Sequence, residues 1–142
     1  MAIRSADARW EGTLKEGKGN LKLKSGAFEG QYSFSSRFEE GTGTNPEELL
    51  GAAHAGCYSM ALNAALERNG TTPDYVHTIA KVHMGKDAND QLAVTKIDLI
   101  VEASVPGLTA GDFQTFAEDA KNNCIISRAL NVAEMTIDAT LK

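Results

Sequence analysis

Cysteine and proline are scarce in this chain, with two cysteines and three prolines among 142 residues. Two cysteines 67 positions apart cannot form the dense disulfide framework that stabilises small secreted domains. The first residues, MAIRSADARWEG, contain no apolar stretch and no small-residue cleavage site, so no signal peptide is predicted there. We therefore expect a cytoplasmic protein whose two thiols are either inert core residues or a redox pair.

Clusters of basic residues are also absent, and the formal net charge is -5 with a sequence pI of about 5.2. Nucleic acids and anionic membrane surfaces both attract clustered lysine and arginine, so this charge balance argues against either partner. The longest apolar stretch, residues 49–66, is interrupted by glycine, histidine, serine and asparagine. It is therefore not predicted to span a membrane.

The overall composition is that of an ordinary globular protein, with 42% hydrophobic and 23% charged residues. A chain of this length usually forms one domain around one core. It contains no internal repeat, no low-complexity tract and no linker rich in proline, glycine and serine. We therefore predict a single domain over residues 1–142.

Alternation of apolar and polar residues predicts strands in the first third of the chain. One strand begins within ARWEGTL, and GNLKLKSG alternates Leu21 and Leu23 with lysines, which is typical of a half-buried strand. The segment SGAFEG is typical of a turn. QYSFSSRF alternates again, so a third strand is predicted through Tyr32 and Phe34 to near Arg37, followed by an EEGTG loop.

The clearest boundary is the helix start in TNPEELL. Asn45 is a good N-cap, and Pro46 has no N–H to lose in the first helical position. The two glutamates that follow favour the positive end of the helix dipole. Because Gly70 is a natural C-terminal cap, a helix is predicted over about residues 46–69. It is apolar on more than one face and about 36 Å long, so we expect burial on most sides and a second subunit packed against it.

The second half predicts two strands, two helices and a last strand. A hairpin is predicted from two strands, YVHTIAKVHMG and LAVTKIDLIVEASVP, joined by the turn KDANDQ. Thr109 is the predicted N-cap of a helix that runs to about Asn122, and NCIISRAL begins a short helix near Cys124. EMTIDATLK is the last strand. The order βββ-α-ββ-α-α-β predicts an α+β fold, with antiparallel strands packed on the long central helix.

The two cysteines are the first candidates for chemistry. Free cysteine is among the most buried residue types, so Cys57 in AAHAGCYSMAL, taken alone, is more often an inert core thiol. Cys124 lies between two helical segments, where N–H groups at a helix start can lower a thiol pKa. A buried thiol that tightens the turn is an equally good interpretation of Cys124.

Three segments carry a resemblance to a known family: RFEEGTGTNPEELLGAAHAGCYSMAL, VTKIDLIVEASVPGL and AKNNCIISRAL. With them the chain resembles the OsmC/Ohr family of thiol-dependent organic hydroperoxide reductases, most closely its osmotically inducible OsmC branch. The resemblance runs from WEGTLKEGKG to the last strand. It implies that Cys57 is the peroxidatic cysteine and Cys124 the resolving one. It also implies that Arg37 and Glu47 are the active-site arginine and helix-start glutamate.

The resemblance implies a peroxidase that reduces organic hydroperoxides, and hydrogen peroxide less well, to alcohols. Cys57 would become a sulfenic acid, and Cys124 would condense with it to form an intrachain disulfide. An external dithiol, of lipoyl type in the family, would reduce that disulfide. No metal, haem or flavin is expected. Burial raises a thiol pKa, so a Cys57 thiolate needs a cation such as Arg37, which Glu47 can hold bidentately.

The spacing of Glu47 and Cys57 leads to a prediction about assembly. Ten residues on one helix correspond to about 15 Å along its axis, too far for the two side chains to share a site through that helix. We therefore expect an intertwined homodimer in which Glu47, and in one version Arg37 too, comes from the other subunit. The two active sites would then lie at the subunit interface.

Other functions remain open on the sequence alone. His54 lies three residues before Cys57 on the same helical face, so a Cys57–His54 hydrolase or thioltransferase is one alternative. A histidine with a structural hydrogen bond is the commoner interpretation of His54. Glu48 could compete with Glu47 for Arg37, or act as a solvated or capping acid. A non-catalytic stress-response or ligand-binding protein with inert thiols is the remaining alternative.

Overall fold

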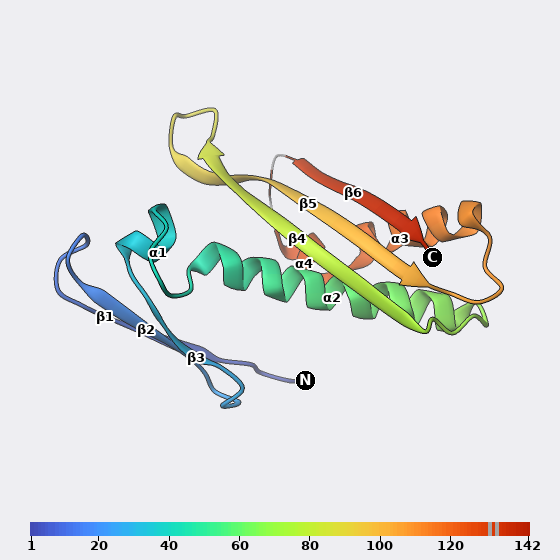
Figure 1. Cartoon of the computed structure of the whole chain (residues 1–142), viewed down its shortest axis with the longest axis horizontal. Coiled ribbons are helices and arrows are strands. Elements are labelled where there is room, and N and C mark those ends of the chain that lie inside the picture. The colour runs from blue at the N-terminus through green and yellow to red at the C-terminus, as the bar shows by residue number, and fades with distance from the viewer. Residues whose placement is uncertain (131, 133) are drawn as a thin grey trace. The chain divides into compact units, whose positions relative to one another are not determined.

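The computed structural model describes residues 1–130, 132 and 134–142 of the chain. These residues form two compact units, Met1–Leu49 and Leu50–Lys142. Each unit contains its own three-stranded sheet, as Figure 1 shows. The single domain expected over residues 1–142 stays a prediction.

The first unit is built on an antiparallel sheet of β1 (Ala6–Glu11), β2 (Lys18–Leu23) and β3 (Glu29–Tyr32). All three strands were predicted from the alternating pattern. The rings of Trp10 and Tyr32 pack with their centroids 5.3 Å apart. Gly19 lies against both rings, and a Cβ at this position would come within 2.2 Å of the Tyr32 ring. This close approach explains why a glycine occupies the middle of the sheet.

The predicted third strand ends earlier than expected, because residues Phe34–Phe38 form the short helix α1. Ser33 Oγ accepts the Ser36 N–H at 3.1 Å, and Ser36 Oγ accepts the Ser33 N–H at 2.9 Å. This capping box stabilises a helix start where the aromatic alternation predicted a strand up to Arg37. The prediction of a strand to Arg37 is therefore wrong. The hydrogen bonds between the two serines stabilise a helix here, in place of the backbone hydrogen bonds that would extend β3.

Helix α2, Pro46–Arg68, begins where predicted and ends within a residue of the prediction. Asn45 Oδ1 accepts the Glu48 N–H at 2.8 Å, and Gly70 adopts a φ of +83° just beyond the C-terminus. Met60 is 76% exposed, so this chain by itself covers one side of α2, and burial of the other side by a second subunit stays a prediction. The buried residues form one stripe at helical spacing: Gly51, His54, Tyr58, Leu62 and Leu66.

The second sheet contains the predicted hairpin of β4 (Tyr75–Lys86) and β5 (Leu92–Ser104), followed by β6 (Glu134–Leu141). One pairing differs from the expectation of antiparallel strands, because β6 runs parallel to β5. Helices α3 (Ala110–Asn123) and α4 (Ile125–Ala129) lie between β5 and β6 in the chain. A helical crossover of this kind is what a parallel pair requires.

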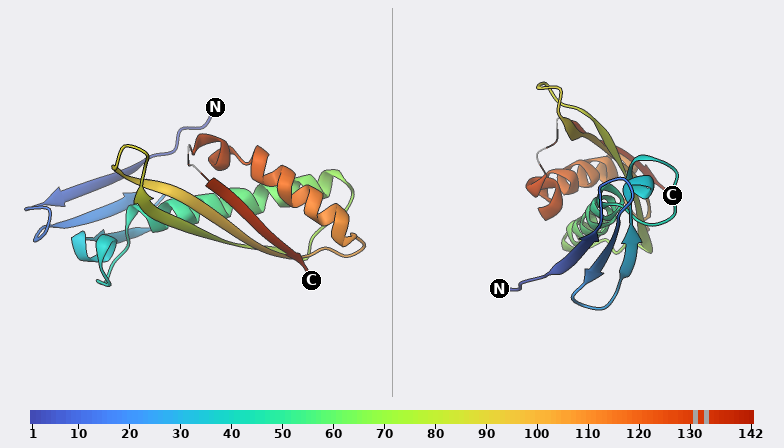
Figure 2. Two further views of the ribbon diagram at one scale, coloured as in Figure 1. Left: turned by 90° about the horizontal axis from the view of Figure 1, so that it is seen from above. Right: turned by 90° about the vertical axis from the view of Figure 1, so that its left-hand side faces the viewer.

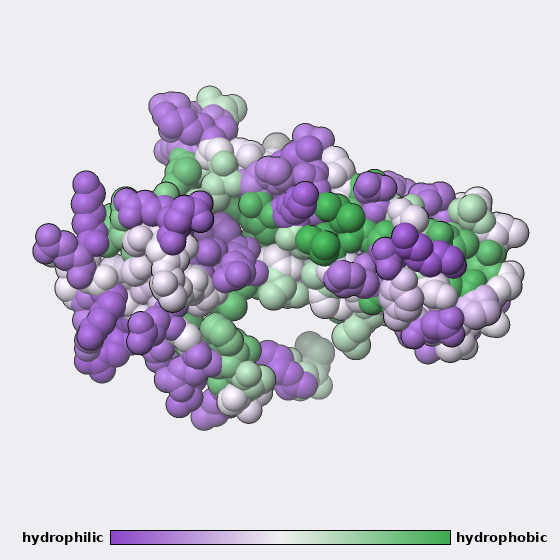
Figure 3. Space-filling view, viewed as in Figure 1, coloured by the Kyte–Doolittle hydropathy of each residue, from purple (hydrophilic) through white to green (hydrophobic). Residues whose placement is uncertain are grey.

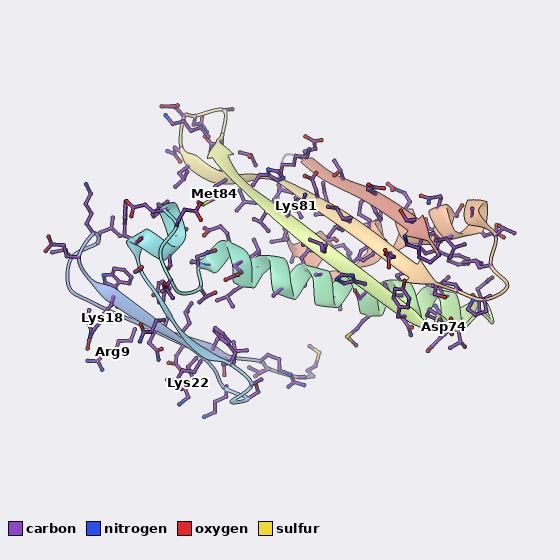
Figure 4. The ribbon with its side chains drawn as sticks, viewed as in Figure 1. Arg9, Lys18, Lys22, Asp74, Lys81 and Met84 are labelled. Carbon is purple, nitrogen blue, oxygen red and sulfur yellow. The ribbon has the colours of Figure 1, made fainter. Side chains whose placement is uncertain are left out.

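One face of this second sheet is covered by helices and the other is open. Figure 2 shows α2 and α3 on the same side of the sheet. Alternate residues of β5 are buried in the core cluster with Tyr58, Leu62 and Phe113. On the open side, Ile79 of β4 is 47% exposed, and apolar and polar side chains mix over β4 in Figure 3. Lys81 lies on the same strand (Figure 4).

The N-cap of α3 gives a direct test of the fold. Thr109 Oγ1 accepts the Asp112 N–H at 3.1 Å, as the sequence predicted. We expect Thr109→Ala to lower the free energy of unfolding by about 1 kcal/mol in a urea titration, because one helix N–H loses its acceptor. Thr109→Ser keeps the hydroxyl and should retain most of the stability. An equal loss in both variants would mean that the threonine methyl group, and not the cap, stabilises this turn.

Candidate active site

Arg37 and Glu47 form a bidentate ion pair in the first unit. Arg37 Nη2 lies 2.6 Å from Glu47 Oε1, and Arg37 Nε lies 3.1 Å from Glu47 Oε2. The Glu47 side chain is only 13% exposed and that of Arg37 is 37% exposed. The hydrogen bond with Glu47 raises the pKa of Arg37 further above its already high value. The guanidinium is therefore a fixed cation with a defined orientation.

Two contacts explain why this pair forms locally. Asn45 Nδ2 donates to the Ser36 carbonyl at 3.1 Å, and Ser36 Oγ donates to the Thr44 carbonyl at 2.7 Å, which ties α1 to the start of α2. Glu48 accepts a hydrogen bond from Thr44 Oγ1 at 2.8 Å. Glu48 therefore contacts the loop, and the competition with Glu47 for Arg37 that the sequence left open does not occur in this structure.

Cys57 and Cys124 come together in the second unit. Cys57 lies on α2, and Cys124 lies at the junction of α3 and α4 and is 1% exposed; neither is in a disulfide. Burial raises the pKa of Cys57, and the neighbouring Cys124 raises it further. Burial would raise the pKa of Cys124 too, but hydrogen bonding from Cys57 and Ser127 outweighs it and lowers that pKa. The hydrogen bond between the two sulfurs contributes to both shifts, in opposite directions.

Both cysteines line a pocket of about 850 Å³ in the second unit. Its wall is largely apolar and includes Met60 and Ala61 of α2 and Phe116 of α3. Such a wall favours an organic molecule over a small polar one, because contact with it removes apolar surface from water. An organic substrate in this pocket would lie next to both sulfurs.

His54 is a fully buried residue whose side chain reaches α4. Its Nε2 lies 2.7 Å from Ser127 Oγ, which confirms the interpretation of a histidine with a structural hydrogen bond. Burial lowers the pKa of His54, so the ring is neutral near pH 7. Sequence reasoning did not single out Ser127. Its only signal was its position, three residues after Cys124 at the start of a short helix.

The four predicted site residues thus form two pairs, one in each unit: Arg37 with Glu47, and Cys57 with Cys124. Across the described ranges, no group of three or more histidine, cysteine, aspartate or glutamate side chains could hold a metal ion. In the same part of the chain, no helix is long and apolar enough to cross a membrane.

Comparison with known proteins identifies the fold and the family. A sequence model described as OsmC-like protein matches residues 39–140. The chain is also 46% identical over 141 residues to Peroxiredoxin OsmC of Escherichia coli (strain K12), covering 98% of this chain and 96% of that protein. The chain belongs to the OsmC-like family. The resemblance seen in the sequence is confirmed.

Solved structures of OsmC-like and Ohr proteins share the fold. An OsmC-like protein of unknown function from Vibrio cholerae O1 biovar eltor aligns with a TM-score of 0.82 at 18% identity, covering 99% of this chain and 100% of that one. The organic hydroperoxide resistance protein OhrB of Bacillus subtilis aligns with a TM-score of 0.69 at 20% identity, covering 97% and 98%. The α+β fold class predicted from the sequence is confirmed.

The Arg37–Glu47 pair can be tested by a double-mutant cycle. We expect Arg37→Ala and Glu47→Ala to be non-additive by about 1 kcal/mol in urea unfolding, because each removes the same partly buried ion pair. The matched control is Glu48→Ala, which should add to Arg37→Ala within error because Glu48 contacts Thr44. Full additivity of Arg37→Ala and Glu47→Ala would contradict the pairing.

Proposed function

We propose that this OsmC-like protein is a thiol-dependent peroxidase that reduces organic hydroperoxides to alcohols, and hydrogen peroxide less well. The observation that carries the proposal is the contact between Cys57 and Cys124 on the wall of a largely apolar pocket. Cys57 is the partly exposed thiol of the two, so it is the one that a substrate can reach. The name of the Escherichia coli relative, Peroxiredoxin OsmC, supports the same activity.

In the first step, the Cys57 thiolate attacks the hydroxyl-side oxygen of the hydroperoxide. The S–O bond forms, the O–O bond breaks, and the alkoxide takes up a proton to leave as the alcohol. Cys57 becomes a sulfenic acid. Because burial raises the Cys57 pKa, this step needs a cation to stabilise the thiolate and the developing alkoxide. Arg37, held in place by Glu47, is the residue we assign to this role.

In the second step, the Cys124 thiolate attacks the sulfenic sulfur of Cys57. The S–S bond forms, the S–O bond breaks, and hydroxide leaves and is protonated to water. The Ser127 backbone N–H, the Ser127 hydroxyl and the Ile126 backbone N–H hydrogen-bond the Cys124 sulfur and lower its pKa, which suits a nucleophile. An external dithiol, which we expect to be of lipoyl type, then reduces the disulfide by exchange. The thiols themselves carry the electrons, so the proposed cycle uses no metal or prosthetic group.

We further propose that the protein acts as an intertwined homodimer with its active sites at the subunit interface. Met60 on α2 and Ile125 on α4 are 76% and 74% exposed, which leaves apolar surface beside the pocket that a second copy can bury. Two α2 helices packed antiparallel would bring each helix start near the middle of the other. Glu47 and Arg37 of one chain would then reach Cys57 of its partner. The cytoplasm, which keeps thiols reduced, is the compartment we assign.

The peroxidase chemistry predicts a defined stoichiometry. One equivalent of an organic hydroperoxide added to reduced protein should remove two hydrogens by intact mass, with Cys57 linked to Cys124 within one chain. Cys57→Ser should consume no peroxide, whereas Cys124→Ser should consume about one equivalent and then stop turning over with dithiol. Arg37→Ala should raise the Cys57 pKa, so the first step should require a higher pH.

Four other outcomes of these experiments would favour an alternative function or remove a residue from its proposed role. An unchanged mass after a modest excess of hydroperoxide would favour a binding protein with inert thiols. Normal dithiol turnover by Cys124→Ser would show that Cys124 is not the resolving cysteine. An unchanged pH profile in Arg37→Ala would remove Arg37 from the first step. Hydrolase activity that survives Cys124→Ala and is lost in His54→Ala would favour the Cys57–His54 alternative.

The homodimer predicts that static light scattering at micromolar concentration gives twice the chain mass of 15.2 kDa. Met60→Glu places a charge on the exposed apolar face of α2 and should weaken association, because the charge must lose its hydration to enter an interface. Lys81→Glu on β4 is the matched control and should leave the mass unchanged. A monomeric mass for the unmodified protein would overturn both the dimer and the shared active site.

A further inference from the structure

A buried polar pair, His54 and Ser127, lies beside the resolving cysteine and has no part in the reaction described so far. His54 is 0% exposed, Ser127 is 8% exposed and Cys124 is 1% exposed. His54 Nε2 lies 2.7 Å from Ser127 Oγ. Cys124 is the N-cap of α4 and Ser127 is its third residue, positions whose side chains lie side by side at a helix start. Hydrogen bonding from Ser127 lowers the Cys124 pKa. His54 on α2 thus contacts Ser127 on α4, and Ser127 in turn contacts the Cys124 sulfur.

The directions of the hydrogen bonds among His54, Ser127 and Cys124 follow from the donors and acceptors available. Ser127 has one hydroxyl proton, which can point either to His54 Nε2 or to Cys124. His54 Nδ1 is buried and has no hydrogen-bond partner among the described residues. A buried N–H without an acceptor is rarer in proteins than a buried lone pair without a donor. The proton of the neutral ring is therefore best placed on Nε2, where it donates to Ser127 Oγ.

We propose that His54 is a positioning residue for Cys124: its Nε2–H donates to Ser127 Oγ and so directs the Ser127 hydroxyl proton to the Cys124 sulfur. This assignment rests on the proposed peroxidase function, in which Cys124 forms the disulfide. No proton is transferred between these three side chains. Ser127 keeps its proton and His54 stays neutral, and the hydrogen bond stabilises the thiolate that attacks the Cys57 sulfenic acid. The products of that step remain the disulfide and hydroxide.

Other titratable groups around Cys124 do not take over this role. Cys57 is the reaction partner itself. Tyr58, the residue next to it on α2, donates its hydroxyl to the Ala117 carbonyl at 2.8 Å. Burial holds the pKa of Tyr58 far above its ordinary value, so it stays protonated. Glu118 of α3 contributes a negative charge near Tyr58. Asp119 of α3 and Arg68 of α2 line the same pocket as Cys124.

The test is a titration of Cys124 in a Cys57→Ala background, where it is the only thiol. Thiolate formation is followed by its ultraviolet absorbance, so the buried sulfur does not have to react. We expect His54→Leu to raise the midpoint by about one pH unit, because the hydroxyl proton is no longer directed to the sulfur. Ser127→Ala should raise it similarly, and His54→Leu should add little on top of Ser127→Ala.

His54→Gln is the matched rescue variant, because its side-chain amide can donate from near the position of Nε2. It should restore a midpoint close to that of the parent. Equal shifts in His54→Gln and His54→Leu would show that packing, and not the donor, is what matters, and would overturn the proposal. Unshifted midpoints in both His54→Leu and Ser127→Ala would overturn it as well. Ser127→Ala is a small change that keeps the test usable if His54→Leu does not fold.

Kinetics with intact thiols provide the second readout. In His54→Leu, formation of the sulfenic acid should keep its rate, while closure of the disulfide at neutral pH should slow several-fold and recover at higher pH. Slowing of both steps to the same extent would contradict a role at Cys124. The titration uses no peroxide, so it separates the two proposals. A protein that shows the titration shifts but does not reduce hydroperoxide would disprove the peroxidase and leave the positioning contact in place.

Discussion

The packing of α2 against α3 is the contact on which the rest of the site depends. Tyr58 is fully buried and bonds the carbonyl of Ala117, which fixes the rotation of α2 against α3 at the level of Cys57. Cys124 ends α3, so the same contact determines where the second sulfur lies. Two thiols 67 positions apart in the chain can form a disulfide only if the helices that carry them keep this register.

Burial raises the pKa of both thiols, and the two sulfurs differ in how hydrogen bonding acts on them. Burial raises the pKa of Cys57, whereas hydrogen bonding lowers that of Cys124. The thiol that we propose as the resolving one is therefore hydrogen-bonded within its own unit by neutral groups. The proposed attacking thiol instead requires a charge, and Arg37 with Glu47 is a cation already oriented for that purpose. This division of roles explains why a peroxidase of this kind would need both a buried neutral pair and a charged pair.

Local sequence signals predicted the elements well where the cause of each element is itself local. The start of α2 follows from Asn45 and Pro46, and the start of α3 from Thr109, because caps act within one turn. Helix α1 was missed because two serine hydroxyls, separated by two residues, outweighed the aromatic alternation of QYSFSSRF. The parallel pairing of β6 was missed because strand direction depends on the crossover path and not on the strand's own residues.

The sequence by itself determined the chemistry available: two cysteines, a helix-start glutamate and an arginine, in a pattern that places the chain in its family. It also determined most helix and strand boundaries, since these depend on neighbours within a few residues. Only the tertiary structure decided that Arg37 pairs with Glu47 and not with Glu48. It also decided that His54 contacts Ser127, the residue beside Cys124. Those contacts depend on which faces of packed elements meet, and no short-range pattern encodes that.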